Sequence, residues 1–179
     1  HDLAHGWAGS MTLPRKLSLK DGRLVQELPE SVKDHFLVEN APETIVKGNQ
    51  ITIPARGKQT LFEIGAKSGR SFILSYGNES DADSALQLIY DASNKRFSMS
   101  RDQFGHPISG KESPEIQSRW IQLDGEKDHH FSILRDTNSI EVFVDGKTLS
   151  MTFYETTENT VYTFKADEGV DLVVKTYQK

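Results

Sequence analysis

The histidines are the first side chains of this sequence that could do acid–base or metal chemistry. Among six histidines, only His129 and His130 are adjacent. Neighbouring residues of a strand point to opposite faces of the sheet, so such a pair cannot chelate one metal ion from a regular strand. We expect one imidazole to point inward and the other to solvent, and we predict no metal site.

The acidic residues do not identify a catalytic pair. With 26 Asp and Glu in the chain, some carboxylates will lie close together by chance. We expect the pairs Arg101-Asp102 and Arg135-Asp136 to lie on the surface or in turns. A nucleophile elbow, a phosphate-binding P-loop and an H-E-x-x-H motif are all absent from the sequence. We therefore predict no catalytic residue and no cofactor.

Three aromatic residues could stack on a sugar ring. Trp120 lies in a strand-like segment, which favours a buried structural role over a binding platform. Phe143 shares a strand face with the polar residues Ser139, Glu141 and Asp145, and we favour cross-strand packing over a sugar platform for it. Trp7 is the third candidate, and it lies in the segment 5–26, which is discussed below.

Length and composition exclude several classes of protein. At 179 residues the chain predicts one domain with a short appendage. The net charge is −5 with acidic and basic residues interspersed, which argues against nucleic acid or an anionic membrane as a partner. Cysteine is absent, so disulfides and thiolate metal sites are excluded. Apolar runs are too short for a membrane helix or a signal peptide, and the first residue is His1, so we expect a processed product or a piece of a longer chain.

Alternation of apolar and polar residues with period two is the dominant pattern. Strands are predicted at 60–66, 71–76, 84–90, 96–100, 128–134, 139–145 and 170–177. Turns are predicted at Asp21-Gly22, Gly48-Asn49, Ser68-Gly69, Gly77-Asn78, Phe104-Gly105, Asp124-Gly125 and Asp145-Gly146. This spacing predicts an all-β fold, a two-sheet antiparallel β-sandwich of concanavalin-like or jelly-roll-like type, with few or no helices.

Two other segments complete the expected organisation. Residues 29–38 could form one or two helical turns opened by Pro29, and residues 101–115 read as a surface loop. In the segment 139–145, Ile140, Val142 and Val144 share one face, which we predict to face the core.

Two stretches resemble a known family. Residues 5–26 (HGWAGSMTLPRKLSLKDGRLVQ) resemble the junction segment of glycoside hydrolase family 32, the β-fructosidases. Residues 131–146 (FSILRDTNSIEVFVDG) are similar to a hairpin of the same family, and residues 97–101 are similar to one of its strands. In that family the junction links a catalytic propeller to a C-terminal β-sandwich.

The resemblance implies a division at residue 22. Residues 1–22 would form the junction segment, the end of a propeller plus a linker strand, and residues 23–179 the sandwich domain. Trp7, Met11, Pro14 and Arg15 would contact the five-bladed catalytic propeller of the same parent chain. Contacts between copies of the parent are a further expectation.

The sequence departs from the family most clearly in what it lacks. The family's catalytic carboxylates lie in propeller motifs, W-M-N-D-P-N-G, R-D-P and E-C, and none of these occurs here. The turn Asp145-Gly146 is shorter than its family counterpart, and Ser100 stands where the family often has Asp. We therefore expect this chain alone to be inactive, as a non-catalytic sandwich domain of an enzyme that hydrolyses sucrose, sucrose-6-phosphate or fructan.

Two alternatives remain beside this interpretation. An autonomous fructan- or sugar-binding module would share the fold, and so would a structural or interaction protein with no link to sugars. The resemblance of the junction sequence favours a cytoplasmic parent enzyme, with a secreted one as the alternative.

Overall fold

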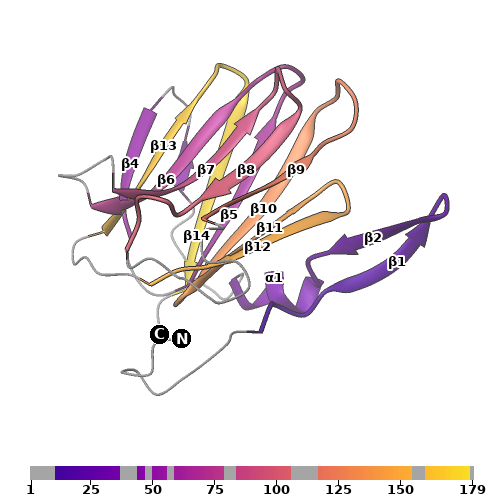
Figure 1. Cartoon of the computed structure of the whole chain (residues 1–179), viewed down its shortest axis with the longest axis horizontal. Coiled ribbons are helices and arrows are strands. Elements are labelled where there is room, and N and C mark those ends of the chain that lie inside the picture. Colours follow the sequence, from indigo (N-terminus) through magenta and orange to yellow (C-terminus); the bar gives the residue numbers. More distant parts are fainter. Residues whose placement is uncertain are drawn as a thin grey trace.

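Two antiparallel sheets packed face to face form the body of the molecule (Figure 1). The computed structural model describes residues 11–36, 44–46, 50–55, 59–78, 84–105, 117–154 and 160–177. The first sheet has the strand order β12 (Lys147–Thr152), β11 (Ser139–Val144), β10 (His129–Asp136), β5 (Gln59–Ala66), β14 (Val170–Tyr177) and β3 (Thr44–Val46). The second has the order β4 (Gln50–Pro54), β13 (Thr160–Ala166), β6 (Phe72–Asn78), β7 (Ala85–Asp91), β8 (Arg96–Ser100) and β9 (Ser118–Gln122).

A separate hairpin projects from one side of this sandwich (Figure 1). It consists of β1 (Lys16–Lys20) and β2 (Arg23–Glu27), joined by the turn Asp21-Gly22. Both turn residues have positive φ, 50° and 73°, as a two-residue type I′ turn requires. The turn Asp145-Gly146 between β11 and β12 has the same geometry, with φ of 52° and 72°. Both predicted turns are therefore confirmed.

Alternating side chains from the two sheets fill the space between them. Ile140, Val142 and Val144 all lie in this core, as predicted. Aromatic rings make up much of it, and the rings of Phe72 and Phe131 meet edge to face at 5.0 Å between centroids. The all-β sandwich expected from the sequence is the observed fold.

Each of the seven predicted strands is present, with its bounds shifted by no more than two residues. The other strands of the structure, β1, β2, β3, β4, β9, β12 and β13, were not among these seven ranges. The predicted turn at Gly77-Asn78 is wrong, because both residues belong to β6. A Cβ on Gly77 would lie 2.9 Å from the Ser84 carbonyl oxygen, so this glycine allows a close approach of two strands. The turn predicted at Gly48-Asn49 and residues 106–115 of the predicted loop lie outside the described residues.

A short helix and the junction cover the outer face of the first sheet. The helix α1 (Glu30–Phe36) follows Pro29, inside the predicted segment 29–38. A second apolar cluster of Leu28, Leu61, Leu134 and Phe143 lies here, with Leu13 and Val32 packed against it. Phe143 is thus buried by packing rather than displayed to a sugar. No helix within the described ranges has the length and apolar character of a membrane span.

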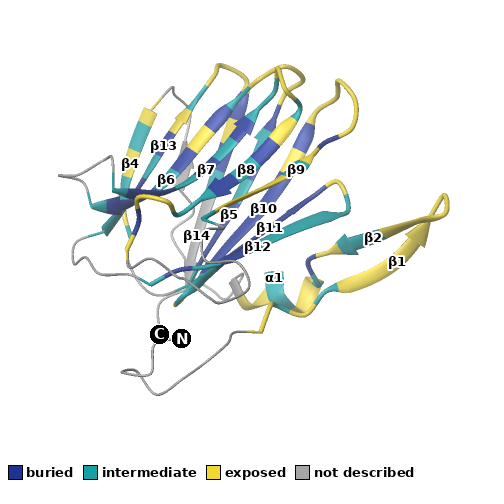
Figure 2. Cartoon of the chain, in the orientation of Figure 1, coloured by how far each residue is buried: buried dark blue, intermediate teal, exposed yellow. Residues whose placement is uncertain are grey.

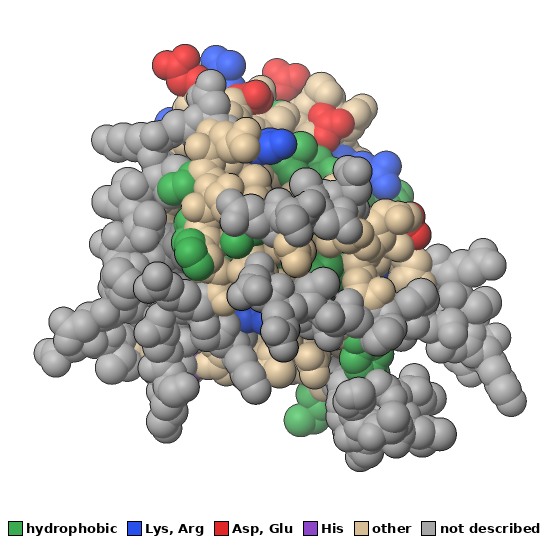
Figure 3. Space-filling view, turned by 90° about the vertical axis from the view of Figure 1, so that its left-hand side faces the viewer, with side chains coloured by type: hydrophobic (Ala, Val, Ile, Leu, Met, Phe, Trp, Pro, Cys, Tyr) green, Lys and Arg blue, Asp and Glu red, His purple; other side chains and the backbone are tan. Residues whose placement is uncertain are grey.

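Charged residues of both signs are mixed on the surface seen from the side of β4. At the upper end of Figure 3, acidic and basic side chains lie next to one another rather than in separate patches.

Candidate functional site

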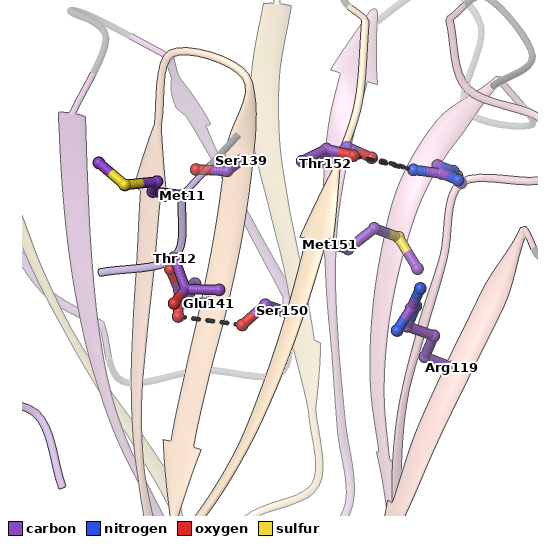
Figure 4. Close-up of a pocket in the computed structure, with 9 residues that line it drawn as sticks. Met11, Thr12, Arg119, Ser139, Glu141, Ser150, Met151 and Thr152 are labelled. Atoms are coloured by element: carbon purple, nitrogen blue, oxygen red, sulfur yellow. Dashed lines mark hydrogen bonds between the residues drawn. The ribbon is translucent and has the colours of Figure 1, made fainter. Parts of the chain in front are cut away.

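A groove opens where the edge strands of the two sheets, β12 and β9, meet the start of the described chain (Figure 4). We call it the junction groove. It is lined by Met11, Thr12, Arg101, Arg119, Ser139, Glu141, Ser150, Met151 and Thr152. The groove straddles β12: Ser150 lies beside Glu141 on the outer face of the sheet, whereas Met151 faces the core.

Glu141 fixes the junction to the sheet on one side of the groove. Its side chain is 2% exposed and accepts a short hydrogen bond from the backbone N–H of Leu13 on Oε1. On Oε2 it accepts a hydrogen bond from the Ser150 hydroxyl at 3.0 Å. The guanidinium of Arg15 lies 3.5 Å from the same oxygen and supplies the compensating charge.

Arg15 extends this network to the hairpin. Its Nη1 donates to the Gln26 side-chain oxygen at 2.8 Å, and its Nη2 donates to the Ser150 hydroxyl at 3.0 Å. Gln26 also donates its backbone N–H to the Gly146 carbonyl at 2.8 Å. The hairpin is therefore held to β11 and β12 through polar contacts at its base.

Two arginines lie on the other side of the groove, Arg101 directly after β8 and Arg119 on β9. Arg101 donates from Nη1 to the Thr152 carbonyl and from Nε to the Gln117 side-chain oxygen at 3.0 Å. Burial and the nearby charge of Arg119 lower the pKa of Arg101 below its ordinary value. Figure 4 shows Arg119 next to Met151, with Thr12, Glu141 and Ser150 grouped on the opposite side.

Large apolar side chains are exposed along the hairpin and beside the groove. Leu17, Leu19 and Leu24 are 61%, 76% and 60% exposed, and Met11 is 93% exposed. Leu19 and Leu24 are directly paired across the hairpin. Figure 2 shows the hairpin as the most exposed part of the described chain. Such a cluster of apolar side chains marks a surface suited to contact with another structure.

The four residues predicted to contact a propeller occupy different environments. Trp7 lies outside the described residues. Met11 and Pro14 are exposed, so both are accessible to a partner. Arg15 is engaged with Glu141, Gln26 and Ser150, so it acts within this chain. The propeller contact itself stays a prediction.

The expected burial of Trp120 is wrong. Its side chain is 54% exposed on the edge strand β9, where it pairs with Ser98 on the outer face of the second sheet. The guanidinium of Arg96 lies 4.5 Å from the centre of the ring, a cation–π contact that covers one face of the indole.

The expected surface position of Arg135 is also wrong. Arg135 is 4% exposed, and its guanidinium lies 4.7 Å from the centre of the Tyr76 ring. Its Nη2 donates to the Tyr76 hydroxyl at 2.7 Å. Arg135 shares a strand face with Phe131 and Ile133, so the alternation places it toward the core. Asp136, as predicted, lies at a turn, where it accepts the backbone N–H of Thr137.

The adjacent histidines point to opposite faces, as expected. His129 is buried with Nδ1 2.8 Å from Asp145, whereas His130 is exposed with Nε2 2.7 Å from Glu63. Burial would raise the pKa of Glu63, but hydrogen bonds from His130 and Ser132 outweigh it and lower the pKa. The ranges that the structure covers hold no group of three or more side chains suited to bind a metal.

The described residues of the groove do not provide the pair of carboxylates that glycoside hydrolysis requires. Glu141 is the sole carboxylate among its described lining residues, and both of its oxygens accept hydrogen bonds from the protein. Two carboxyl groups on either side of a substrate are needed for that reaction. The contacts of Glu141 are instead those of a structural anchor, which sequence reasoning missed because its partners lie far away in the chain.

Comparison with known proteins gives a match over most of the chain. The family described as "Glycosyl hydrolases family 32 C terminal" matches residues 25–178. No curated protein sequence matches.

Solved structures give the same fold at low sequence identity. A sucrose-6-phosphate hydrolase from Lactobacillus gasseri superposes with a TM-score of 0.75 at 19% identity, over 92% of this chain and 33% of that one. An exo-inulinase from Aspergillus awamori gives 0.74 at 16% identity, over 97% and 37%. A β-fructofuranosidase from Bombyx mori gives 0.73 at 13% identity, over 98% and 34%. The chain spans about a third of the length of these proteins.

Proposed function

Because this chain belongs to the C-terminal domains of glycosyl hydrolase family 32, we propose that it serves as the non-catalytic sandwich of a β-fructosidase. In this role it packs on the catalytic propeller of the same parent chain and stabilises it. The parent enzyme hydrolyses the fructosyl bond of sucrose, sucrose-6-phosphate or a fructan, and the catalytic carboxylates come from the propeller.

The observation that carries this proposal is the exposed apolar hairpin with a polar anchor at its base. Leu17, Leu19 and Leu24 remain open to solvent in the isolated chain, although burying each such side chain would stabilise the protein by roughly 1.5–3 kcal/mol. The Glu141–Arg15 network meanwhile fixes the junction that leads to this surface. A rigid base and an uncovered apolar face are what a docking element between two domains needs.

The experiment uses the parent enzyme encoded with this domain and a matched pair of variants. Leu17→Ser with Leu24→Ser removes apolar contacts on the hairpin, and Ile73→Ser removes an exposed apolar side chain (37% exposed) on the outer face of the second sheet. We expect the hairpin variant to lower the melting temperature of the parent by several degrees and the Ile73 variant to leave it unchanged. Equal melting temperatures for wild type and hairpin variant would refute the packing role.

The isolated chain provides the second arm. Here the same hairpin variant should leave the unfolding midpoint unchanged, because its side chains are already exposed. The isolated chain should also show no turnover of sucrose in a sensitive assay, and turnover would overturn the non-catalytic assignment.

The exposed indole of Trp120 favours a second candidate function, an autonomous fructan- or sugar-binding module. One face of the ring is covered by Arg96, so the opposite face could stack on a sugar. Calorimetry with fructose, sucrose and levan tests this candidate. Heat of binding to levan that disappears in Trp120→Ala would support it, and absence of heat at high ligand concentration would exclude it.

A further inference from the structure

A row of side chains crosses the outer face of the second sheet from β13 to β9 (Figure 1). Each member is the register partner of the next, and its neighbours along the strand point into the core. We call this the outer row, and its members are Lys165, Ile73, Ile89, Ser98 and Trp120. Strands lie about 4.8 Å apart, so the row is about 19 Å long. A ligand that contacts the whole row must therefore be an extended chain.

One end of the outer row lies in a pocket. Ile73, Ile89 and Lys165 line it, together with the carboxylates of Asp91 and Asp167. Both carboxylates already accept hydrogen bonds from backbone N–H groups of this chain. The pocket therefore offers two isoleucine side chains for apolar contact, with one ammonium group beside them.

The indole of Trp120 forms the other end of the row. It is 54% exposed, and the guanidinium of Arg96 lies 4.5 Å from the ring centre and covers one face. The small side chain of Ser98 separates the indole from Ile89. Sugar rings present flat faces of C–H groups, which pack on aromatic and aliphatic side chains. The row thus offers stacking at one end and apolar contact at the other.

A second row of side chains runs beside the first and holds only uncharged polar residues. We call it the hydroxyl row, and its members are Thr163, Ser75, Gln87, Ser100 and Ser118. The hydroxyls of Thr163, Ser75 and Ser118 make no hydrogen bond to any described residue. Hydroxyl and amide groups both donate and accept hydrogen bonds, as the hydroxyls of a sugar do. The absence of charge in this row matches a neutral ligand.

We propose that the outer row and the hydroxyl row together bind an uncharged polysaccharide, whose chain lies across the strands. Trp120 stacks on one sugar ring, the two isoleucines contact rings further along, and the hydroxyl row meets the sugar hydroxyls. The inference rests on the second candidate function above, from which the choice of a fructan follows, and it adds the face and the extended form of the ligand. The hairpin contacts β11 and β12 of the first sheet, so this site lies on the other layer of the sandwich.

Calorimetry of the isolated chain tests the site with levan, its disaccharide levanbiose, and fructose. We expect levan to bind at least about tenfold more tightly per site than levanbiose, because the disaccharide contacts only part of the row. Binding of levan should change little between low and high salt, because the contacts are uncharged. Equal affinity for levan and levanbiose, or a strong dependence on salt, would overturn the proposal.

Variants at the end of the row remote from Trp120 make the result specific. Ile73→Ser should weaken levan binding about tenfold. Leu24→Ser is the matched control, because it makes the same kind of change at an exposed apolar position on the hairpin, and it should leave levan binding unchanged. Thermal unfolding of both variants shows that each is folded. Lys165→Ala, at an exposed position in the same pocket, gives a second measure that should also weaken binding.

The outcomes separate this inference from the functions proposed above. Levan binding that is lost in Trp120→Ala but unchanged in Ile73→Ser and Lys165→Ala would overturn the extended site and leave the sugar-binding module standing. Absence of levan binding in the wild type would overturn both. A lower melting temperature of the parent enzyme with Ile73→Ser would show that protein covers this face, which would also overturn the proposal.

Discussion

The carboxylate of Glu141 accepts a hydrogen bond from the backbone N–H of Leu13, which lies 128 residues earlier in the chain. The carboxylate is buried, so water cannot replace the protein donors that it would lose. The contact joins the beginning of the described chain to the middle of the first sheet. The arrangement of the junction thus depends on one acidic side chain.

Replacement of this carboxylate should destabilise the protein and loosen the junction. Glu141→Gln removes the charge that faces Arg15 and one acceptor oxygen, so we expect a loss of about 2 kcal/mol in the free energy of unfolding. The Leu13 amide should exchange its hydrogen faster in the same variant. Denaturant unfolding and hydrogen exchange measure the two effects. Glu126→Gln, in an exposed ion pair with Lys95, is the control and should change neither.

The hydroxyl of Tyr76 should contribute to stability more than that of Tyr90. Tyr76→Phe removes the hydroxyl that accepts hydrogen bonds from the buried Arg135 Nη2 and from the Thr160 hydroxyl, a loss of about 1–3 kcal/mol. Tyr90 is equally buried in the same core, but its hydroxyl makes no hydrogen bond to a described residue. Tyr90→Phe should therefore be close to neutral in urea unfolding. Equal losses for both variants would contradict a specific role of the Arg135 contact.

The outer position of Trp120 predicts a small stability effect and an accessible fluorophore. Trp120→Ala should cost about 1 kcal/mol or less, whereas Phe131→Ala in the core should cost about 3–5 kcal/mol. The difference spectrum between wild type and Trp120→Phe isolates the emission of this indole. We expect that emission to be quenched readily by acrylamide, and a shielded, blue-shifted component would show that Trp120 is buried in solution.

Asp91 should make the stability of the folded protein depend on pH in the acidic range. Hydrogen bonds from the Ser93 hydroxyl and from Asn94 lower the pKa of Asp91 from 3.8 to about 2. The folded-state pKa lies below the unfolded-state value, so its contribution to stability is complete above pH 3.8 and is lost as the pH falls toward 2.

Two measurements check this contribution. The difference in unfolding free energy between wild type and Asp91→Asn should be constant above pH 3.8 and shrink below it. A carboxyl titration followed by nuclear magnetic resonance should give a midpoint of about 2, and Ser93→Ala should move it upward. A midpoint near 3.8 in the wild type would contradict the hydrogen bonds that organise this turn.

The sheets were predictable because alternation and turn residues are local signals. The segment 139–145 shows both signals, and the face that was predicted to point inward lies in the core. Alternation places Arg135 on the same face as Phe131 and Ile133, which indicates burial. We predicted a surface position instead because the side chain is charged. The buried arginine is tolerated because Tyr76 supplies both a ring and a hydroxyl.

The errors have physical causes beyond local pattern. Trp120 alternates with Ile121, and the sequence does not reveal which of the two faces the core on an edge strand. Gly77 looked like a turn residue, yet it serves the close approach of Ala85. The role of Glu141 depends on Leu13 and Arg15, and no local pattern joins residues so distant along the chain.

Gly146 links two pieces of the architecture at one point. A Cβ there would lie 2.8 Å from a methyl carbon of Val25, and its carbonyl accepts the backbone N–H of Gln26. The turn between β11 and β12 is therefore also the place where the β1–β2 hairpin contacts the sandwich. The direction in which the hairpin leaves the sandwich is therefore tied to a position where a side chain would collide with Val25.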